Sequence, residues 1–191
     1  MARPREFDSE HVLQQAMHLF WSRGYEAVAI PDLLKQTGLS RSSLYEFFGD
    51  KQSLFIETLN HYKHIGDRKR DVLRNAQSVK EGIQNYFTLH IDMSVDEALP
   101  RGCFITNTAV SLDQVDDQVR RLIEERFEGL ENEFYLLLEK GQQSGEITKD
   151  KNIVELARLF NGLNHGISVM ARVNQDRLVL SDMVNAALKL L

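Results

Sequence analysis

The sequence predicts an all-α protein in which a small amino-terminal helical domain precedes an antiparallel helical bundle. Only three of the 191 residues are proline, which leaves room for long uninterrupted helices. Apolar residues recur at spacings of three and four through most of the chain, as on the buried face of a helix. The composition, 42% hydrophobic and 27% charged, is typical of a packed globular protein.

Charge and cysteine content narrow the classes of protein further. The formal net charge is −5, but the first 70 residues are nearly balanced and the excess of acids falls in the remainder. One cysteine, Cys103, cannot form an internal disulfide or a multi-cysteine zinc site. No apolar run approaches the roughly 20 residues that span a bilayer, and the amino terminus is charged where a signal peptide would be apolar. We therefore expect a cytoplasmic protein with no membrane association.

Two helices are predicted at the start of the chain, and the second of them is short. Asp8 is a suitable N-cap for the first, with Phe7 placed to pack against Val12, and Gly24 ends this helix. The second covers about residues 31–37, because proline is tolerated in a first helical turn and a Thr-Gly pair follows.

A third short helix, 41–48, is predicted after the N-cap residue Ser40. Leu44, Phe47 and Phe48 are expected to point back to the core. The outward face then consists of Arg41, Ser42, Ser43 and Tyr45.

Two short helices joined by a tight glycine-bearing turn are typical of a helix-turn-helix. The second helix of that motif enters the major groove by its amino-terminal end, so small polar and basic residues are needed there. A lysine at the start of the next helix lies beside free backbone N–H groups, which favours a phosphate. An alternative is that these residues form an ordinary solvated face of a helical bundle. The candidate DNA-binding residues are Ser40, Arg41, Ser42, Ser43, Tyr45 and Lys51.

The segment from Ala16 to Phe55 resembles the DNA-binding domain of the tetracycline-repressor (TetR) family. This resemblance implies that the third helix reads an operator, that Tyr45 and Lys51 hold phosphates, and that the chain works as a homodimer on a palindromic double-stranded DNA operator. Two positions depart from the family pattern, Ala29 and Leu34, where threonine and a small alanine are frequent. The residues that carry the resemblance are Gly24-Tyr25, Leu33, Thr37 to Ser40, Leu44-Tyr45, Phe48 and Gly49 to Phe55.

The remainder of the chain is predicted to be helical without a linker. We place the DNA-binding domain at 6–66 and a ligand-binding and dimerisation domain at 67–191. The expected helices are 51–70, 78–95, 103–112, 116–144, 151–173 and 177–190.

The last two predicted helices correspond, by the family resemblance, to a pair that packs against its twin in a four-helix dimer interface. Small residues along the first of them would permit a close approach of helices. The alternative is that their apolar residues form an internal core with no partner. The candidate interface residues are Ile153, Ala157, Phe160, Gly162, Ile167, Met183, Val184 and Ala187.

The segment 100–109 resembles the entry to the sixth helix in one branch of the family, in which an Arg-Gly-Cys run precedes an asparagine. Arg101 and the N–H groups of a helix start would both lower the pKa of the Cys103 thiol, which is the condition for reactivity towards electrophiles or oxidants. Alternatively, Cys103 is a buried apolar filler, as free cysteines often are.

A ligand pocket is expected among the middle helices. For each of its candidate lining residues the alternative is ordinary core packing. These residues are Phe87, His90, Cys103, Asn107, Phe127, Phe134 and Asn164.

Two further kinds of site were weighed. His61 and His64, three residues apart with Asp67 beyond them, have a spacing that can chelate a metal, although such pairs are common without one. Cys103 with His90 or His165 could form a nucleophile and base, but no glycine-rich loop or nucleophile elbow accompanies them. We therefore predict no cofactor, no metal and no enzyme activity.

The predicted function is that of a sequence-specific DNA-binding regulator. The form we expect is a repressor that an unidentified small-molecule inducer releases from its operator. A thiol-based repressor acting through Cys103 is the first alternative, and an activator is a second that the sequence does not separate from a repressor.

Overall fold

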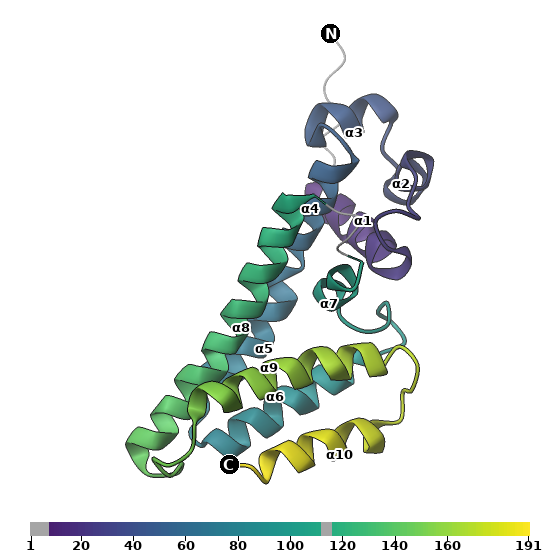
Figure 1. Ribbon diagram of the computed structural model, residues 1–191. Coiled ribbons are helices and arrows are strands. Elements are labelled where there is room, and N and C mark those ends of the chain that lie inside the picture. The colour runs from purple at the N-terminus through teal and green to yellow at the C-terminus, as the bar shows by residue number, and fades with distance from the viewer. Residues whose placement is uncertain (1–7, 112–115) are drawn as a thin grey trace. The chain divides into compact units, whose positions relative to one another are not determined.

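The computed structural model describes residues 8–111 and 116–191, and its described residues form ten helices and no strand (Figure 1). The predicted all-α class is confirmed. Phe7, which was expected to pack on Val12, lies outside the described residues. The helices are α1 Ser9–Arg23, α2 Ile30–Thr37, α3 Arg41–Phe48, α4 Lys51–His61, α5 Lys63–Arg74, α6 Val79–Ser94, α7 Phe104–Ala109, α8 Asp117–Ser144, α9 Ile153–Met170 and α10 Arg177–Leu188.

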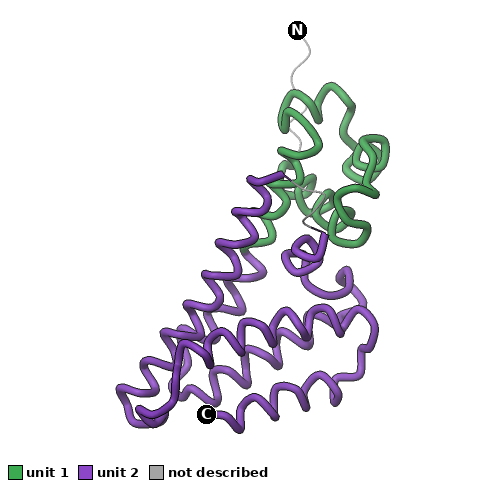
Figure 2. The backbone as a smooth tube through the Cα atoms, in the orientation of Figure 1, with its two compact units in different colours: residues 1–63 green, residues 64–191 purple. Residues whose placement is uncertain are grey.

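The chain divides into two compact units, residues 1–63 and 64–191 (Figure 2). The first unit contains α1 to α4, and the second contains α6 to α10 with nearly all of α5. The expected boundary between residues 66 and 67 lies three residues beyond the observed one.

Side-chain caps fix most helix starts where the sequence predicted them. The Asp8 carboxylate accepts hydrogen bonds from the backbone N–H groups of Glu10 (3.1 Å) and His11 (3.2 Å), which would otherwise be unpaired at the start of α1. Asp116 caps α8 in the same way through the N–H of Gln118, at 2.6 Å. These short-range bonds depend on residues two or three positions apart, which is why the sequence reveals them.

The single helix predicted over 51–70 was wrong, because a turn at Tyr62 separates α4 from α5. The N–H of Tyr62 donates to the Thr58 carbonyl at 3.0 Å, as in a regular helix, and also approaches the Asn60 carbonyl. The Tyr62 ring packs edge-on against Trp21, with 5.1 Å between ring centroids. This contact comes from a distant part of the sequence, and it holds the turn in a position that local propensity does not indicate.

An aromatic core holds the first unit together. Phe20 of α1 and Phe55 of α4 meet edge to face at 5.0 Å between centroids, and Tyr25 lies 4.9 Å from Phe55. Leu33 of α2 and Leu44 of α3 are fully buried. Helices α1, α2 and α4 therefore form a rigid support for α3.

The core of the second unit lies among α6, α8, α9 and α10. Figure 1 shows α9 running beside both α6 and α10, and each of these pairs is in contact. Phe87, Phe134 and Phe160 come from three of these helices and contact one another at centroid distances of 5.7 to 6.2 Å. Within the described ranges, no helix combines the length and the apolar character that crossing a membrane requires.

Candidate DNA-binding surface and buried polar cluster

The turn between α2 and α3 has helix-turn-helix geometry. Gly38 adopts the left-handed conformation (φ 72°), which an L side chain rarely adopts, and its N–H donates to the Leu34 carbonyl at 3.0 Å. The N–H of Leu39 then donates to the Thr37 hydroxyl at 3.3 Å. Every polar backbone group named here has a partner, so the turn directs α3 without strain.

Ser40 fixes the start of α3. Its hydroxyl accepts the N–H of Ser43 at 3.0 Å, as expected of an N-cap. The same hydroxyl lies 2.9 Å from that of Ser42 and 2.8 Å from that of Ser43. The three serines therefore form one small hydrogen-bonded group at the end of the helix that faces solvent.

The predicted outward face of α3 is largely observed, with one correction. Arg41, Ser42 and Tyr45 are exposed, Tyr45 by 43%. Phe47, expected in the core, is 49% exposed, so that expectation was wrong. Leu44 is buried and Phe48, one turn later, is partly buried, so these two residues form the inner face of this eight-residue helix. Phe47 is rotated from Phe48 by about 100° around the helix axis and therefore points outward.

Lys51 lies at the first position of α4, directly after its cap. The Asp50 carboxylate accepts the N–H of Ser53 at 2.7 Å, and this hydrogen bond holds the pKa of Asp50 below its ordinary value. The Lys51 ammonium lies 4.2 Å from the centroid of the Tyr25 ring, within the range of a cation–π interaction. This contact holds the long side chain of Lys51 against the aromatic core.

Several of the predicted pocket residues are brought together in the second unit. His90 Nε2 lies 2.9 Å from the backbone oxygen of Asn164, and the rings of Phe87 and Phe134 stack at 5.9 Å. Cys103 is buried and is the N-cap residue of α7. The other two predicted residues are only partly buried: the Asn107 amide donates to the Arg101 carbonyl at 3.0 Å, and Phe127 stacks on His165 at 3.8 Å.

Three residues of this buried region were missed as pocket residues. Lys69 stands between two arginines, a run typical of a surface, yet it is 6% exposed and its Nζ lies 3.1 Å from His90 Nδ1. Tyr86 donates its hydroxyl to Asn164 Oδ1 at 2.9 Å. His165 was considered only as a catalytic base. The positions of Tyr86 and His165, one turn from His90 and beside Asn164 in the sequence, were the available signal.

Burial disfavours the charged forms in this cluster. Loss of hydration lowers the pKa of Lys69, raises that of Tyr86 and lowers that of His90 well below its ordinary range. Burial, with a smaller effect of the nearby Lys69 charge, lowers the pKa of His165 to about 4. The cluster is therefore polar without being fully charged at neutral pH.

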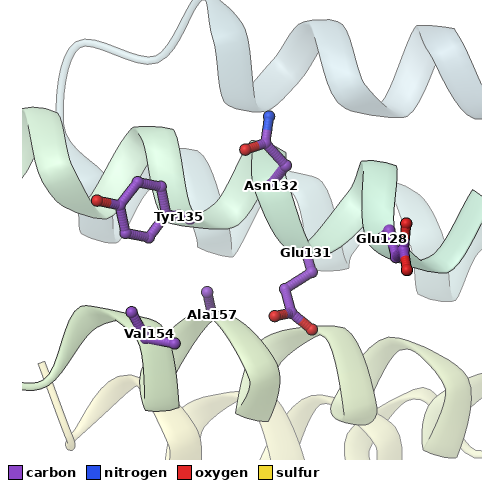
Figure 3. A pocket seen from close by; sticks show the side chains of 6 residues that line it. All are labelled: Glu128, Glu131, Asn132, Tyr135, Val154 and Ala157. Carbon is purple, nitrogen blue, oxygen red and sulfur yellow. The ribbon is translucent and has the colours of Figure 1, made fainter. Parts of the chain in front are cut away.

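A surface groove of about 180 Å³ lies between α8 and α9 (Figure 3). It contains none of the residues predicted to line the ligand pocket. Two of its side chains are carboxylates, and one of these, Glu131, pairs with Arg158 at 3.2 Å. The lining residues are Glu128, Glu131, Asn132, Tyr135, Val154 and Ala157.

Most of the residues predicted for a dimer interface lie instead in the core of their own chain. A side chain with almost no exposed surface has none to offer a partner, so this assignment needs correction for the buried members. Ile153 and Met183 are half-buried, and Gly162 is exposed. The buried members are Ala157, Phe160, Ile167, Val184 and Ala187.

The two histidines weighed as metal ligands lie on either side of the turn at Tyr62, His61 in α4 and His64 in α5. In the described residues, no group of three or more histidine, cysteine or acidic side chains is arranged to hold a metal ion.

A capped recognition helix on an aromatic support, with exposed basic and hydroxyl side chains, defines a helix-turn-helix DNA-binding protein. Family models identify it further. Residues 12–58 match the model "Bacterial regulatory proteins, tetR family", and residues 80–187 match "Tetracyclin repressor-like, C-terminal domain". The chain belongs to the TetR family, and it is a transcriptional regulator and not an enzyme.

Similar proteins support this assignment over the whole chain. The HTH-type transcriptional regulator YezE of Bacillus subtilis is 32% identical over 195 residues, covering 100% of both chains. The HTH-type transcriptional repressor ComR of Escherichia coli is 28% identical, covering 98% of this chain and 90% of ComR. A cysteine mutant of the TetR-family regulator CifR, complexed with 26-base-pair double-strand operator DNA, superposes with a TM-score of 0.89 at 33% identity, covering 98% of each chain.

Proposed function

We propose that this protein is a repressor that binds a palindromic operator as a homodimer and releases it when a small molecule binds the second unit. The observation that carries the proposal is the exposed amino-terminal end of α3, held by the Ser40 cap and by buried Leu44. Two relatives support it, since ComR is named a repressor and the CifR complex contains operator DNA. The protein then acts in the cytoplasm, where operator DNA is accessible.

The proposed DNA contacts divide by chemistry. The guanidinium of Arg41 suits a guanine edge or a phosphate, and the hydroxyl of Ser42 suits a base edge or a phosphate. We assign the Tyr45 hydroxyl and the Lys51 ammonium to phosphate oxygens. Ser40 acts through the cap that positions the others, since its hydroxyl already accepts a backbone N–H.

We place the dimer interface on the exposed face of α9 and on the neighbouring α10. A stripe with alternating spacings of three and four residues continues past the end of α9, through Leu159, Gly162, Gly166, Val169 and Val173, the repeat of helices that pack in pairs. A Cβ atom built at either glycine meets nothing within 4 Å, so the space above both is open for a second helix. One monomer could bind only one half-site of a palindromic operator, so operator binding requires the dimer.

The proposed dimer interface is tested by introducing charged side chains into it. Leu159→Asp and Val169→Asp each place a carboxylate in the proposed contact, and we expect a monomer by analytical ultracentrifugation. Leu136→Asp, at an equally exposed apolar position of α8, is the control and remains dimeric. A dimer that persists in both α9 variants would place the interface elsewhere.

The proposed switch is a change in the balance between two dimer conformations. An inducer that releases most of the operator must favour the released conformation by a few kcal/mol, on the order of 10²-fold in affinity. The candidate site for it is the buried polar cluster of Lys69, Tyr86, His90, Asn164 and His165, because burying ionisable groups costs stability and a binding role would explain why they are kept in the core.

A second candidate, repression relieved by modification of Cys103, is favoured by one observation. Cys103 is the N-cap residue of α7, and its charge interaction with Lys69 opposes, without reversing, the lowering of the Lys69 pKa by burial. Lysine and thiolate stabilise each other's charged forms, which favours reaction with electrophiles or oxidants. The test compares Cys103→Ser with the unmodified protein. Operator release by an alkylating agent that is identical in both proteins excludes sensing by this residue.

DNA binding itself is tested by selection from a random duplex pool. We expect a palindromic consensus, with affinity that falls as salt rises because bound phosphates release counterions. A preparation that enriches no sequence, or that enriches only a single half-site, would contradict the proposed mode of binding.

A further inference from the structure

A chain of hydrogen bonds connects α5, α6 and α9 in the second unit and defines the protonation of His90. His90 Nε2 lies 2.9 Å from the backbone oxygen of Asn164 and 3.1 Å from the Ser168 hydroxyl. A carbonyl oxygen only accepts, so Nε2 carries the hydrogen in the neutral ring. His90 Nδ1 is then an acceptor, and it receives an N–H from Lys69 at 3.1 Å.

Lys69 has further N–H groups after this bond is made. Besides His90, its ammonium approaches the Tyr86 ring, at 5.8 Å from the centroid. Among the described residues no carboxylate pairs with Lys69, although six other ion pairs are formed. A buried amine without a carboxylate partner costs stability, and burial lowers the pKa of Lys69 for the same reason.

His165 presents a second buried donor without an acceptor. Its Nδ1 lies 2.9 Å from the Thr106 hydroxyl and 3.4 Å from Asn164 Nδ2. The amide nitrogen only donates, and the Tyr86 hydroxyl bound to Asn164 Oδ1 keeps the amide in that orientation. Nδ1 therefore accepts, and Nε2 carries a hydrogen that is buried and has no partner.

Two further observations describe the surroundings of these donors. The Phe127 ring stacks on His165 at 3.8 Å, so one side of the site is apolar. Asn161, one turn before His165 on α9, is 8% exposed and its Oδ1 is also unpartnered. Unsatisfied buried groups are rare in folded proteins, and these two, one turn apart on α9, can form hydrogen bonds to a polar ligand.

We propose that Lys69 and His165 bind the carboxylate of a small, otherwise apolar acid, and that this acid is the ligand of the second unit. A carboxylate offers two acceptor oxygens to the two N–H donors and supplies the negative charge that Lys69 lacks. The aromatic rings beside the donors accommodate the apolar part of the molecule, and Asn161 Oδ1 accepts a hydroxyl or N–H where the ligand has one. This inference rests on the proposed function for the role of the ligand, but not for its binding.

The test compares acids with their neutral amides on the full-length protein. Acetate, hexanoate and benzoate are titrated by calorimetry, each against acetamide, hexanamide or benzamide. A hydrogen bond to a charged group contributes about tenfold or more in affinity, so we expect at least one acid to bind about tenfold more tightly than its amide. Failure of all three acids to bind, or equal binding of acid and amide, overturns the proposal.

Variants assign the preference to the two residues. Lys69→Met keeps the length of the side chain without its charge, and we expect the acid to bind within about threefold of the amide. Lys80→Met, at an exposed lysine of α6, is the matched control and keeps the preference. His165→Phe keeps a ring against Phe127 while removing the N–H, and it provides the same test should Lys69→Met not fold. An unchanged preference in the folded variants overturns the assignment.

Operator binding without ligand separates this inference from the proposed function. Wild type and Lys69→Met are both expected to bind the selected operator when no acid is present. Acid binding without operator binding would overturn the proposed function and leave the carboxylate site standing. Operator binding without any preference for acid over amide would overturn the carboxylate site and leave the proposed function standing.

Discussion

The two units of this protein treat buried polar groups in different ways. In the first unit the buried hydroxyl of Thr58 donates to the Phe55 carbonyl of its own helix, three residues away. In the second unit Lys69 and His90 bond across helices, over 21 residues of sequence, and His90 reaches Asn164 across 74. The first interior is therefore specified by local bonds and aromatic packing. The second keeps groups that oppose folding, as a site for a ligand requires.

The largest effect on stability is expected at two adjacent residues of α9, one in the core and the other in the proposed interface. Phe160 is fully buried, whereas Leu159 is 42% exposed. Phe160→Ala leaves a cavity and should lower the free energy of unfolding by about 3–5 kcal/mol, measured by chemical denaturation at fixed protein concentration. Leu159→Ala should weaken dimerisation and change folding of the protomer much less. Equal losses of stability would remove the distinction between the two faces of α9.

Acid should destabilise the second unit through its buried histidines. The pKa of His165 is about 4 in the folded protein against 6.5 ordinarily, so between these values the unfolded chain binds the proton and the folded chain does not. Stability is then complete above pH 6.5 and falls towards pH 4, by about 1.4 kcal/mol per pH unit for each such group. The free energy of unfolding, measured by denaturation at a series of pH values, should depend less on pH in His165→Phe than in the wild type. A substitution of exposed His11 should leave this pH dependence unchanged. Identical slopes in both variants would contradict the assignment.

The first unit should lose DNA affinity without losing stability. Arg41→Ala removes an exposed guanidinium, and a base-edge contact of this kind contributes about 1–3 kcal/mol. Tyr45→Phe removes only a hydroxyl and should have a smaller effect. Fluorescence anisotropy with the selected operator measures both, with exposed Arg121→Ala of α8 as the control. Unchanged affinity in both variants would show that α3 does not contact DNA through this face.

The smallest expected effect is a gain in stability from a new helix cap. Ala29 is the N-cap residue of α2 and makes no side-chain cap, although its backbone N–H donates to Asp32 Oδ2 at 3.0 Å. Ala29→Ser places a hydroxyl within reach of the Asp32 N–H, which at present donates only to the Ala29 carbonyl at 3.0 Å, and should stabilise the first unit by about 0.5 kcal/mol. Thermal unfolding measures the gain, and Ala27→Ser, at an exposed position before the helix, serves as the comparison. A gain of the same size at Ala27 would show that capping is not its cause.

The sequence predicted the first unit well because its determinants are local. Asp8, Ser40 and Asp50 cap helices through residues two or three positions away, and glycine ends the second helix as expected. The failures came from tertiary contacts. Tyr62 breaks a predicted helix while packing on Trp21, and Phe47 is exposed because it is rotated by about 100° from Phe48 on the inner face of α3.

The second unit shows the limit of helical periodicity. An apolar residue at the right spacing indicates a buried face, but it does not distinguish a core from a subunit contact, as Phe160 and Ile167 demonstrate. A run of charged residues does not establish exposure either, since Lys69 lies between two arginines and is nevertheless buried. Of the predicted pocket residues, His90, Cys103 and Asn164 are buried, and His90 and Asn164 have hydrogen-bond partners on other helices.

The way α3 is bounded has an evolutionary consequence. Its ends are held by Gly38, Ser40, Gly49 and Asp50, so the side chains at the exposed positions 41, 45 and 46 make none of the capping bonds that shape it. Mutations there can accumulate at little thermodynamic cost after gene duplication. A descendant could thus acquire new target promoters while inheriting the same scaffold unchanged.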